Sequence, residues 1–211
     1  MDEPLSNLDA RLREEVRGKI RELAKQLGST VLYVTHDQIE AMAVADKIAL
    51  MQSGELPQVG APMELYRHPL RVEVAEFFGL VNWVKGKVTQ AGVADTPVGR
   101  LHIAAMANHE DEILLGIRPE SLMIVEGQPA PQSNLLQATF HSCTFLGDQF
   151  VYSVRVGDRL LVGKNRVFPA HVNGQLWLRV APDDIMVFPA RDSSAPSGFD
   201  FKAVAAGGAT R

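Results

Sequence analysis

The chain changes its hydrophobic period near residue 80, and this change limits the folds open to it. Before that point, apolar residues recur every three or four positions or form one short unbroken run. After it, short stretches alternate apolar and polar residues between glycines and prolines. The first pattern is typical of helices and buried strands, and the second of strands in antiparallel sheets. We therefore expect an α/β region followed by an all-β region.

The N-terminal region predicts a helix followed by a buried strand. Residues 10–27 carry an apolar stripe at spacings of three and four, formed by Leu12, Val16, Ile20, Leu23 and Leu27. Asp9 is a suitable N-cap for this helix and Gly28 a suitable C-cap. Residues 30–35 are β-branched and aromatic, which is typical of a strand covered on both faces in a parallel sheet.

The next elements continue the alternation of helix and strand. Residues 38–45 predict a helix and residues 47–52 a strand. A Ser-Gly-Glu turn then leads into residues 56–59, so that these two strands form a hairpin. Residues 62–66 and 72–78 predict two short helices that end at a glycine.

The C-terminal region predicts a small antiparallel barrel. Its expected strands are residues 83–89, 101–104, 113–117, 135–140, 149–156, 159–163, 175–180 and 184–188. We therefore expect one domain over residues 1–80 and a second over residues 81–190. Residues 191–211 are rich in Ser, Ala and Gly and are expected not to pack.

Composition argues against several functional classes. A net charge of −4 and a pI near 5.9 argue against a nucleic-acid partner, because such domains usually carry a clustered basic excess. The sequence has no basic-then-apolar signal segment and no window of about 18 apolar residues that would predict a membrane span. Its one cysteine, Cys143, cannot form an internal disulfide. We expect a cytoplasmic protein.

Four short motifs occur in a fixed order and spacing. They are Asp-Glu-Pro at residues 2–4, Ser-Asn-Leu-Asp at 6–9, Tyr-Val-Thr-His-Asp at 33–37 and Gly-Ile-Arg-Pro-Glu at 116–120. Through these motifs the chain resembles the ATPase subunits of ATP-binding-cassette (ABC) importers, and the resemblance extends to about Pro189. It implies part of a P-loop NTPase cassette followed by a transport-associated OB-like barrel, the TOBE domain.

The resemblance also implies roles for individual residues. Cleavage of a γ-phosphate needs Mg²⁺, a group that orients or deprotonates water, and a polar donor to the transferred phosphoryl group. Asp2 is similar to the residue that holds Mg²⁺, Glu3 to the general base, and His36 to the switch histidine that contacts the γ-phosphate. Asp9 matches the nucleotide-site loop that crosses the ATPase dimer.

Each of these residues also has a simpler interpretation. Acidic residues such as Asp2 and Glu3 are often only solvated, and a histidine such as His36 after a strand is often a structural group. Asp9 could serve only as a helix cap. Arg118 and Glu120 could clamp a ligand, although a structural ion pair is the simpler reading. The histidines show no metal-ligand spacing.

The first half of an ATP site is missing from this sequence. No stretch reads G-x-x-x-x-G-K-[ST], the loop that cradles nucleotide phosphates. In the family, the signature and coupling loops also precede the Asp-Glu-Pro motif. We therefore expect this polypeptide alone neither to bind nor to hydrolyse ATP, and we expect ATP and Mg²⁺ to be cofactors only of a full-length parent. We also expect an exposed apolar surface over the first sixty residues.

Two functions from different classes remain open. The resemblance implies the C-terminal portion of an ATP-hydrolysing importer subunit, which acts as a homodimer beneath membrane permease subunits at the inner face of the plasma membrane. The alternative is a non-catalytic regulatory, dimerisation or small-ligand-binding module. The transported solute is not encoded in an ATPase subunit, because selectivity lies with its partners.

Overall fold

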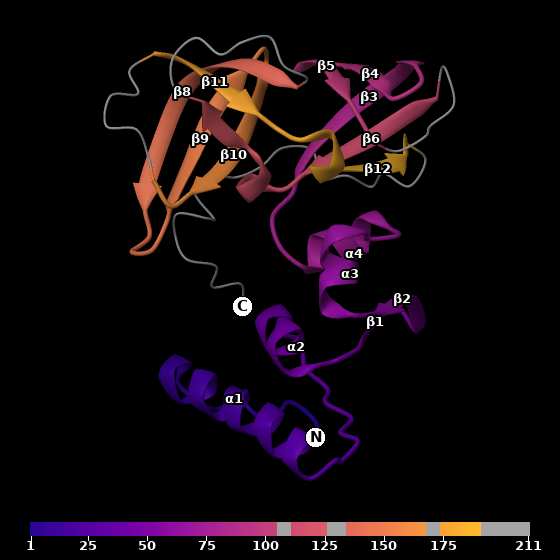
Figure 1. Ribbon diagram of the computed structural model, residues 1–211, viewed down its shortest axis with the longest axis vertical. Helices are drawn as coiled ribbons and strands as arrows, with labels where there is room; N and C mark the ends of the chain where they lie inside the picture. Colours follow the sequence, from indigo (N-terminus) through magenta and orange to yellow (C-terminus); the bar gives the residue numbers. More distant parts are fainter. Residues whose placement is uncertain (105–110, 126–133, 168–173, 191–211) are drawn as a thin grey trace. The chain divides into compact units, whose positions relative to one another are not determined.

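The computed structural model describes residues 1–104, 111–125, 134–167 and 174–190. The chain divides into two compact units, residues 1–79 and residues 80–211, and each is described by itself (Figure 1). The expectation that residues 191–211 do not pack lies outside the described residues. No helix in the described ranges is both long and apolar enough to cross a membrane.

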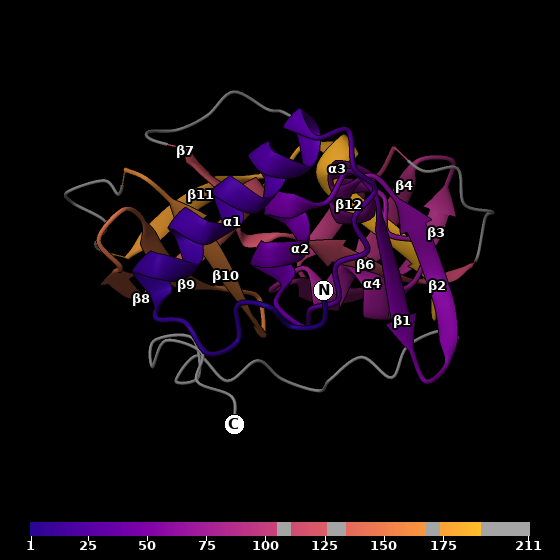
Figure 2. The same ribbon diagram turned by 90° about the horizontal axis from the view of Figure 1, so that it is seen from below.

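The N-terminal unit contains four helices and one hairpin within its described residues. These are α1 (Ala10–Gln26), α2 (Gln38–Val44), β1 (Ile48–Gln52), β2 (Glu55–Gly60), α3 (Pro62–Arg67) and α4 (Val72–Phe77). The predicted N-cap of α1 is confirmed, whereas its C-cap is Leu27, one residue before the predicted Gly28. The Asp9 carboxylate accepts a hydrogen bond from the Leu12 N–H at 3.0 Å, and Gly28 takes the left-handed φ of +59° just past the helix. Figure 2 shows the β1–β2 hairpin along its length.

The prediction of a buried strand over residues 30–35 is wrong. Within this segment only Val34 pairs as a strand residue, in a single parallel bridge with Asp2. Leu32 is 81% exposed and Val34 48% exposed. The described residues of this unit supply no further strand beside the segment, and the only sheet that they form is the antiparallel β1–β2 pair. The predicted parallel sheet is therefore absent from the described residues.

The predicted exposed apolar surface in the first sixty residues is confirmed. Helix α1 has no buried residue, although its apolar stripe is regular. Along that stripe, Leu12 is 41%, Leu23 55% and Leu27 67% exposed. An amphipathic helix normally buries such a stripe against a core.

The C-terminal unit is antiparallel throughout its described pairings, as its period of two predicts. Its strands form two five-stranded sheets, in the orders β10-β9-β8-β11-β7 and β12-β6-β3-β4-β5. They are β3 (Asn82–Gln90), β4 (Val93–Thr96), β5 (Gly99–His102), β6 (Glu112–Ile117), β7 (Met123–Val125), β8 (Leu135–Phe145), β9 (Phe150–Val156), β10 (Arg159–Asn165), β11 (Gln175–Arg179) and β12 (Ile185–Pro189). Two short 3-10 helices, η1 (Pro119–Ser121) and η2 (Pro182–Asp184), precede β7 and β12.

One hydrophobic core joins the two sheets. It includes Val84 and Leu115 from one sheet and Val154 and Leu178 from the other, all nearly inaccessible to solvent. Asn82 adds a polar link inside this core. Its amide exchanges two hydrogen bonds of 2.8 Å with the backbone of Val162 in β10 and donates a third, of 3.1 Å, to the carbonyl of Ile117 in β6. These bonds satisfy backbone groups that would otherwise be buried without partners.

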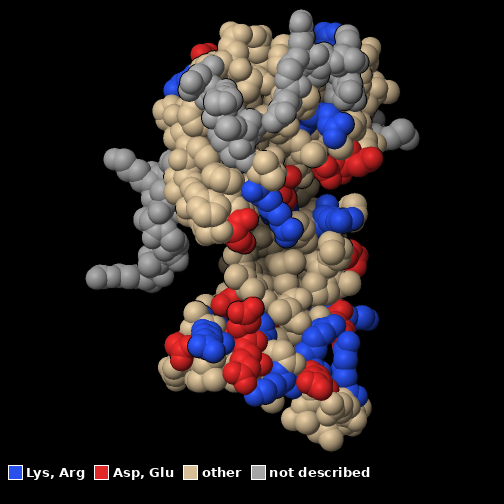
Figure 3. All heavy atoms as spheres, turned by 60° about the vertical axis from the view of Figure 1, so that its left-hand side comes forward, with Lys and Arg blue, Asp and Glu red and all other residues tan. Residues whose placement is uncertain are grey.

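The surface charge is mixed. Lys and Arg side chains alternate with Asp and Glu on the face drawn in Figure 3, and no broad basic area appears on that face. This distribution agrees with the negative net charge of −4.

Candidate functional site

The first three residues lie beside the segment that precedes His36. The Met1 amino group donates to the Leu32 carbonyl at 2.9 Å, and the Val34 N–H donates to the Met1 carbonyl at the same distance of 2.9 Å. The Glu3 N–H then donates to the Val34 carbonyl at 2.9 Å. These backbone bonds place Glu3 and His36 on neighbouring chain segments, although they are far apart in sequence.

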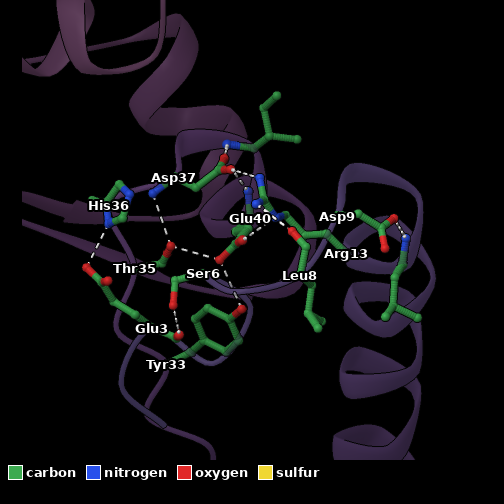
Figure 4. A network of polar contacts seen from close by, with 12 residues as sticks. Glu3, Ser6, Leu8, Asp9, Arg13, Tyr33, Thr35, His36, Asp37 and Glu40 are labelled. Carbon is green, nitrogen blue, oxygen red and sulfur yellow. Dashed lines mark hydrogen bonds and ion pairs between the residues drawn. The ribbon is translucent and has the colours of Figure 1, made fainter. Parts of the chain in front are cut away.

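Glu3 and His36 form a direct side-chain pair. The His36 Nδ1–H donates to the Glu3 Oε1 at 2.7 Å (Figure 4). Both groups remain accessible, with the His36 side chain 77% and the Glu3 side chain 46% exposed. The imidazole Nε2 has no hydrogen-bond partner among the described residues. Both side chains of the pair are therefore accessible to a ligand from solvent while they remain hydrogen-bonded to each other.

The backbone of Glu3 has an unusual conformation. Its φ of +40° lies in the left-handed region, which is uncommon for a residue other than glycine. Ser6 holds it there, because its hydroxyl and N–H both donate to the Glu3 carbonyl, at 3.0 and 3.3 Å. Such conformations are found preferentially at functional sites, where the surrounding contacts outweigh their cost.

The partner of His36 changes its acidity. The hydrogen bond with Glu3, and next the negative charge of Glu3, raise the pKa of His36 above its usual value. The charges of Asp37 and Glu40 act in the same direction but more weakly. A larger fraction of His36 is therefore the imidazolium cation at neutral pH, which favours contact with an anionic ligand.

We expect Glu3→Gln to lower the pKa of His36 toward its ordinary value, because the amide removes the carboxylate charge. An NMR titration of the His36 ring against pH measures this shift, with Glu14→Gln on the exposed face of α1 as the control. Since the pKa is raised in the folded chain, the pair stabilises the fold below the unfolded-state pKa of about 6.5, and this contribution is lost as pH rises through the folded-state pKa. Equal titration curves for the Glu3→Gln and unmodified chains would contradict the pairing.

The other predicted site residues have separate positions. Asp2 is exposed and adjoins Glu3 in the chain, and its carboxylate has no hydrogen-bond or ion-pair partner among the described residues. Asp9 uses its carboxylate to cap α1. Within the described residues, no group of three or more His, Cys, Asp or Glu side chains gathers as a metal site. The structure therefore places Glu3 and His36 together, with Asp2 beside Glu3 and Asp9 at the start of α1.

One residue near the pair was not identified from the sequence. Glu40 is only 3% exposed and accepts hydrogen bonds from the hydroxyls of Tyr33 and Thr35, at 3.0 and 2.8 Å. It stands three residues after the helix cap Asp37, a spacing typical of a capping box. That spacing is the sequence signal that could have identified Glu40, but it predicts a solvated helix end and does not predict burial.

Comparisons with known proteins match both units. Residues 115–188 match the TOBE domain. The chain is 40% identical over 179 residues to the trehalose/maltose import ATP-binding protein MalK of Thermococcus litoralis, covering 79% of this chain and 48% of that protein. It is 37% identical over 194 residues to the Fe(3+) ions import ATP-binding protein FbpC of Fusobacterium nucleatum, covering 89% of this chain and 52% of that protein.

A third relative has a similar coverage. The sn-glycerol-3-phosphate import ATP-binding protein UgpC of Jannaschia sp. is 37% identical over 190 residues, which are 87% of this chain and 47% of that protein. The chain thus spans about half the length of these relatives. Among solved structures, the cytoplasmic molybdate-binding protein ModG aligns with a TM-score of 0.44 at 10% identity, over 50% of this chain and 94% of that one. That likeness is too weak to carry a conclusion.

Proposed function

Since residues 115–188 match the TOBE domain and the chain is homologous to the ATP-binding subunits of ABC importers, we propose that it is the C-terminal portion of such a subunit. In a longer protein it would help couple ATP hydrolysis to solute uptake. The observation that carries the proposal is the contact of 2.7 Å between Glu3 and His36. Homologues define the class of protein, and this contact supports assigning the hydrolytic step to two particular side chains.

Glu3 is suited to orient and deprotonate an attacking water. Its Oε1 accepts from His36, so Oε2 is available for a water molecule. A general base must lie within hydrogen-bond reach of the proton that it removes, and an exposed carboxylate at a chain turn meets this need. Its backbone is held by Ser6 in the left-handed region, and its side chain reaches His36.

His36 is suited to donate a hydrogen bond to the transferred phosphoryl group. Its raised pKa favours the imidazolium form, in which both ring nitrogens carry protons. Nδ1–H remains bonded to Glu3, and Nε2–H is available to a ligand because the His36 side chain is exposed. One histidine thereby holds the base in place and stabilises negative charge on the phosphate.

Asp2 is the residue that we assign to Mg²⁺. Magnesium usually takes one or two carboxylates, with water and substrate phosphates completing its coordination, and the exposed, unpaired carboxylate of Asp2 fits this requirement. When bound with ATP, the ion would supply charge neutralisation at the β- and γ-phosphates. Asp9, besides capping α1, is the residue that we assign to the contact with the second subunit's nucleotide site.

The partners of the longer protein follow from the same proposal. We assign it to a homodimer that associates with the membrane permease subunits of an importer at the inner face of the plasma membrane. In this assembly the two sheets of the C-terminal unit would act as an OB-like module for dimerisation or regulation. A purely regulatory or ligand-binding role is a weaker candidate, because it gives no use to the Glu3–His36 pair, which lies outside the TOBE match over residues 115–188.

The proposal is tested with a chimaera in which residues 1–211 replace the matching half of the T. litoralis relative. We expect the 211-residue chain alone to show no micromolar ATP binding, because it has no phosphate-binding loop, and the chimaera to bind and hydrolyse ATP. Fluorescent-nucleotide titration and phosphate release measure the two activities, with the intact relative as the reference. Micromolar binding by the chain alone, or a folded chimaera that binds ATP without turnover, would contradict the proposal.

A further inference from the structure

Glu40 is a buried charge connected to the segment that carries His36. Its exposure is 3%, and its Oε2 accepts from both the Tyr33 hydroxyl, at 3.0 Å, and the Thr35 hydroxyl, at 2.8 Å (Figure 4). Burial, and then the bond to Glu40, raise the pKa of Tyr33 to about 12. A buried carboxylate is costly unless such donors compensate it. These bonds therefore fix the residues before His36 to helix α2.

The residue after His36 is fixed by the same group of contacts. The Thr35 hydroxyl accepts from the Asp37 N–H at 3.0 Å. The Asp37 carboxylate in turn accepts from the N–H groups of Ile39 and Glu40, at 2.7 and 3.1 Å, and so caps α2. His36 is thus held between two anchored neighbours, while its own ring stays exposed.

Arg13 connects these contacts to the loop before α1. Its Nη2 donates to the Leu8 carbonyl at 2.9 Å. Its Nε lies 3.8 Å from the Glu40 Oε1, and its Nη1 lies 3.9 Å from the Asp37 Oδ2. The guanidinium therefore spans from the loop of residues 6–9 to Asp37 and Glu40, which both follow His36.

We propose that Glu40 is a positioning residue which, with Thr35 and Arg13, fixes His36 against Glu3 and couples this pair to the loop of residues 6–9. The catalytic meaning of this coupling rests on the proposed function, but the positioning itself can be measured without nucleotide. A change in that loop would reach the pair through Leu8, Arg13 and Glu40.

The test is to measure the pKa of His36 in the full 211-residue chain by recording NMR spectra of the histidine rings as a function of pH. Three variants each remove one part of the contact group: Arg13→Gln, Glu40→Gln and Thr35→Val. If they act only through space, loss of the Arg13 cation raises the pKa of His36 or leaves it unchanged, loss of the Glu40 anion lowers it, and Thr35→Val leaves it unchanged. If they position His36, all three loosen its contact with Glu3 and lower its pKa.

We expect all three variants to lower the pKa of His36 toward the value in Glu3→Gln. Thr30→Val, at an exposed position in the same segment, is the control and should leave it unchanged. Thr35→Ser keeps the hydroxyl and should retain the normal titration, which separates loss of the bond from general loss of folding. A raised or unchanged pKa in Arg13→Gln, an unchanged pKa in Thr35→Val, or a Thr35→Ser titration that matches Thr35→Val would each overturn the proposal.

These outcomes are independent of ATP chemistry. A chimaera that fails to hydrolyse ATP, alongside the expected titrations, would refute the proposed function and leave the positioning intact. If the chimaera hydrolyses ATP but the His36 titrations follow the through-space pattern, the proposed function is supported and the positioning role is refuted.

Discussion

We expect Glu3→Gln to lower the rate of ATP hydrolysis by the chimaera about 100-fold or more at saturating ATP, the effect typical of removing a general base. Glutamine keeps the size of the side chain and can still accept from His36, but it cannot take a proton from water. Because the substitution removes no phosphate contact, the apparent affinity for ATP should stay nearly unchanged. Steady-state phosphate release over a range of ATP concentrations gives kcat and KM separately.

Glu14→Gln, an exposed glutamate on α1, is the matched control for Glu3→Gln and should hydrolyse ATP at the unmodified rate. Hydrolysis by the Glu3→Gln variant within a few-fold of that rate would remove Glu3 from the role of base. A rise in KM at constant kcat would instead indicate that Glu3 serves only in binding.

We expect Gly163→Ala to destabilise the C-terminal unit by about 3 kcal/mol, through overpacking and the loss of a buried hydrogen bond. Gly163 in β10 faces Tyr152 in β9, and an added Cβ would lie 2.1 Å from the Cζ of that ring. The ring is fully buried, and its hydroxyl donates to the Leu122 carbonyl at 2.6 Å. It therefore cannot move aside without giving up this bond.

Urea unfolding followed by tryptophan fluorescence measures this effect, because both tryptophans, Trp83 and Trp177, lie in the C-terminal unit. Gly18→Ala is the control, since a Cβ at that position on α1 meets nothing within 4 Å. It should leave the transition unchanged. An equal unfolding midpoint for Gly163→Ala and the unmodified chain would show that the sheet relaxes around the added methyl group.

Local sequence signals predicted the elements that depend on local contacts. Helix α1 begins and ends where Asp9 and Gly28 indicate, and the β1–β2 hairpin follows its Ser-Gly-Glu turn. Strands β4 and β7 were missed, because three or four residues carry too little periodicity. The strand predicted over residues 30–35 failed for another reason: its composition requires cover on both faces, and that cover must come from other parts of a protein.

The candidate site also contains residues that the sequence predicted and one that it did not. Glu3 and His36 were singled out by motifs whose order resembles a known family, and the structure places them in contact. Glu40 was not, because a glutamate in the first turn of a helix ordinarily faces water. Its burial depends on Tyr33, Thr35 and Arg13, which come from two other segments, and no local pattern contains that information.

The extended stretch from Val31 to Val34 has a practical consequence for handling the protein. Its backbone is bonded to residues 1–3 only at Leu32 and Val34, while the N–H and C=O of Tyr33 have no hydrogen-bond partner in the described ranges. Apolar side chains with open backbone groups form a template on which the same stretch of a neighbouring molecule can add. We therefore expect concentrated solutions of the isolated chain to aggregate through this stretch, and we expect Leu32→Lys to reduce that aggregation.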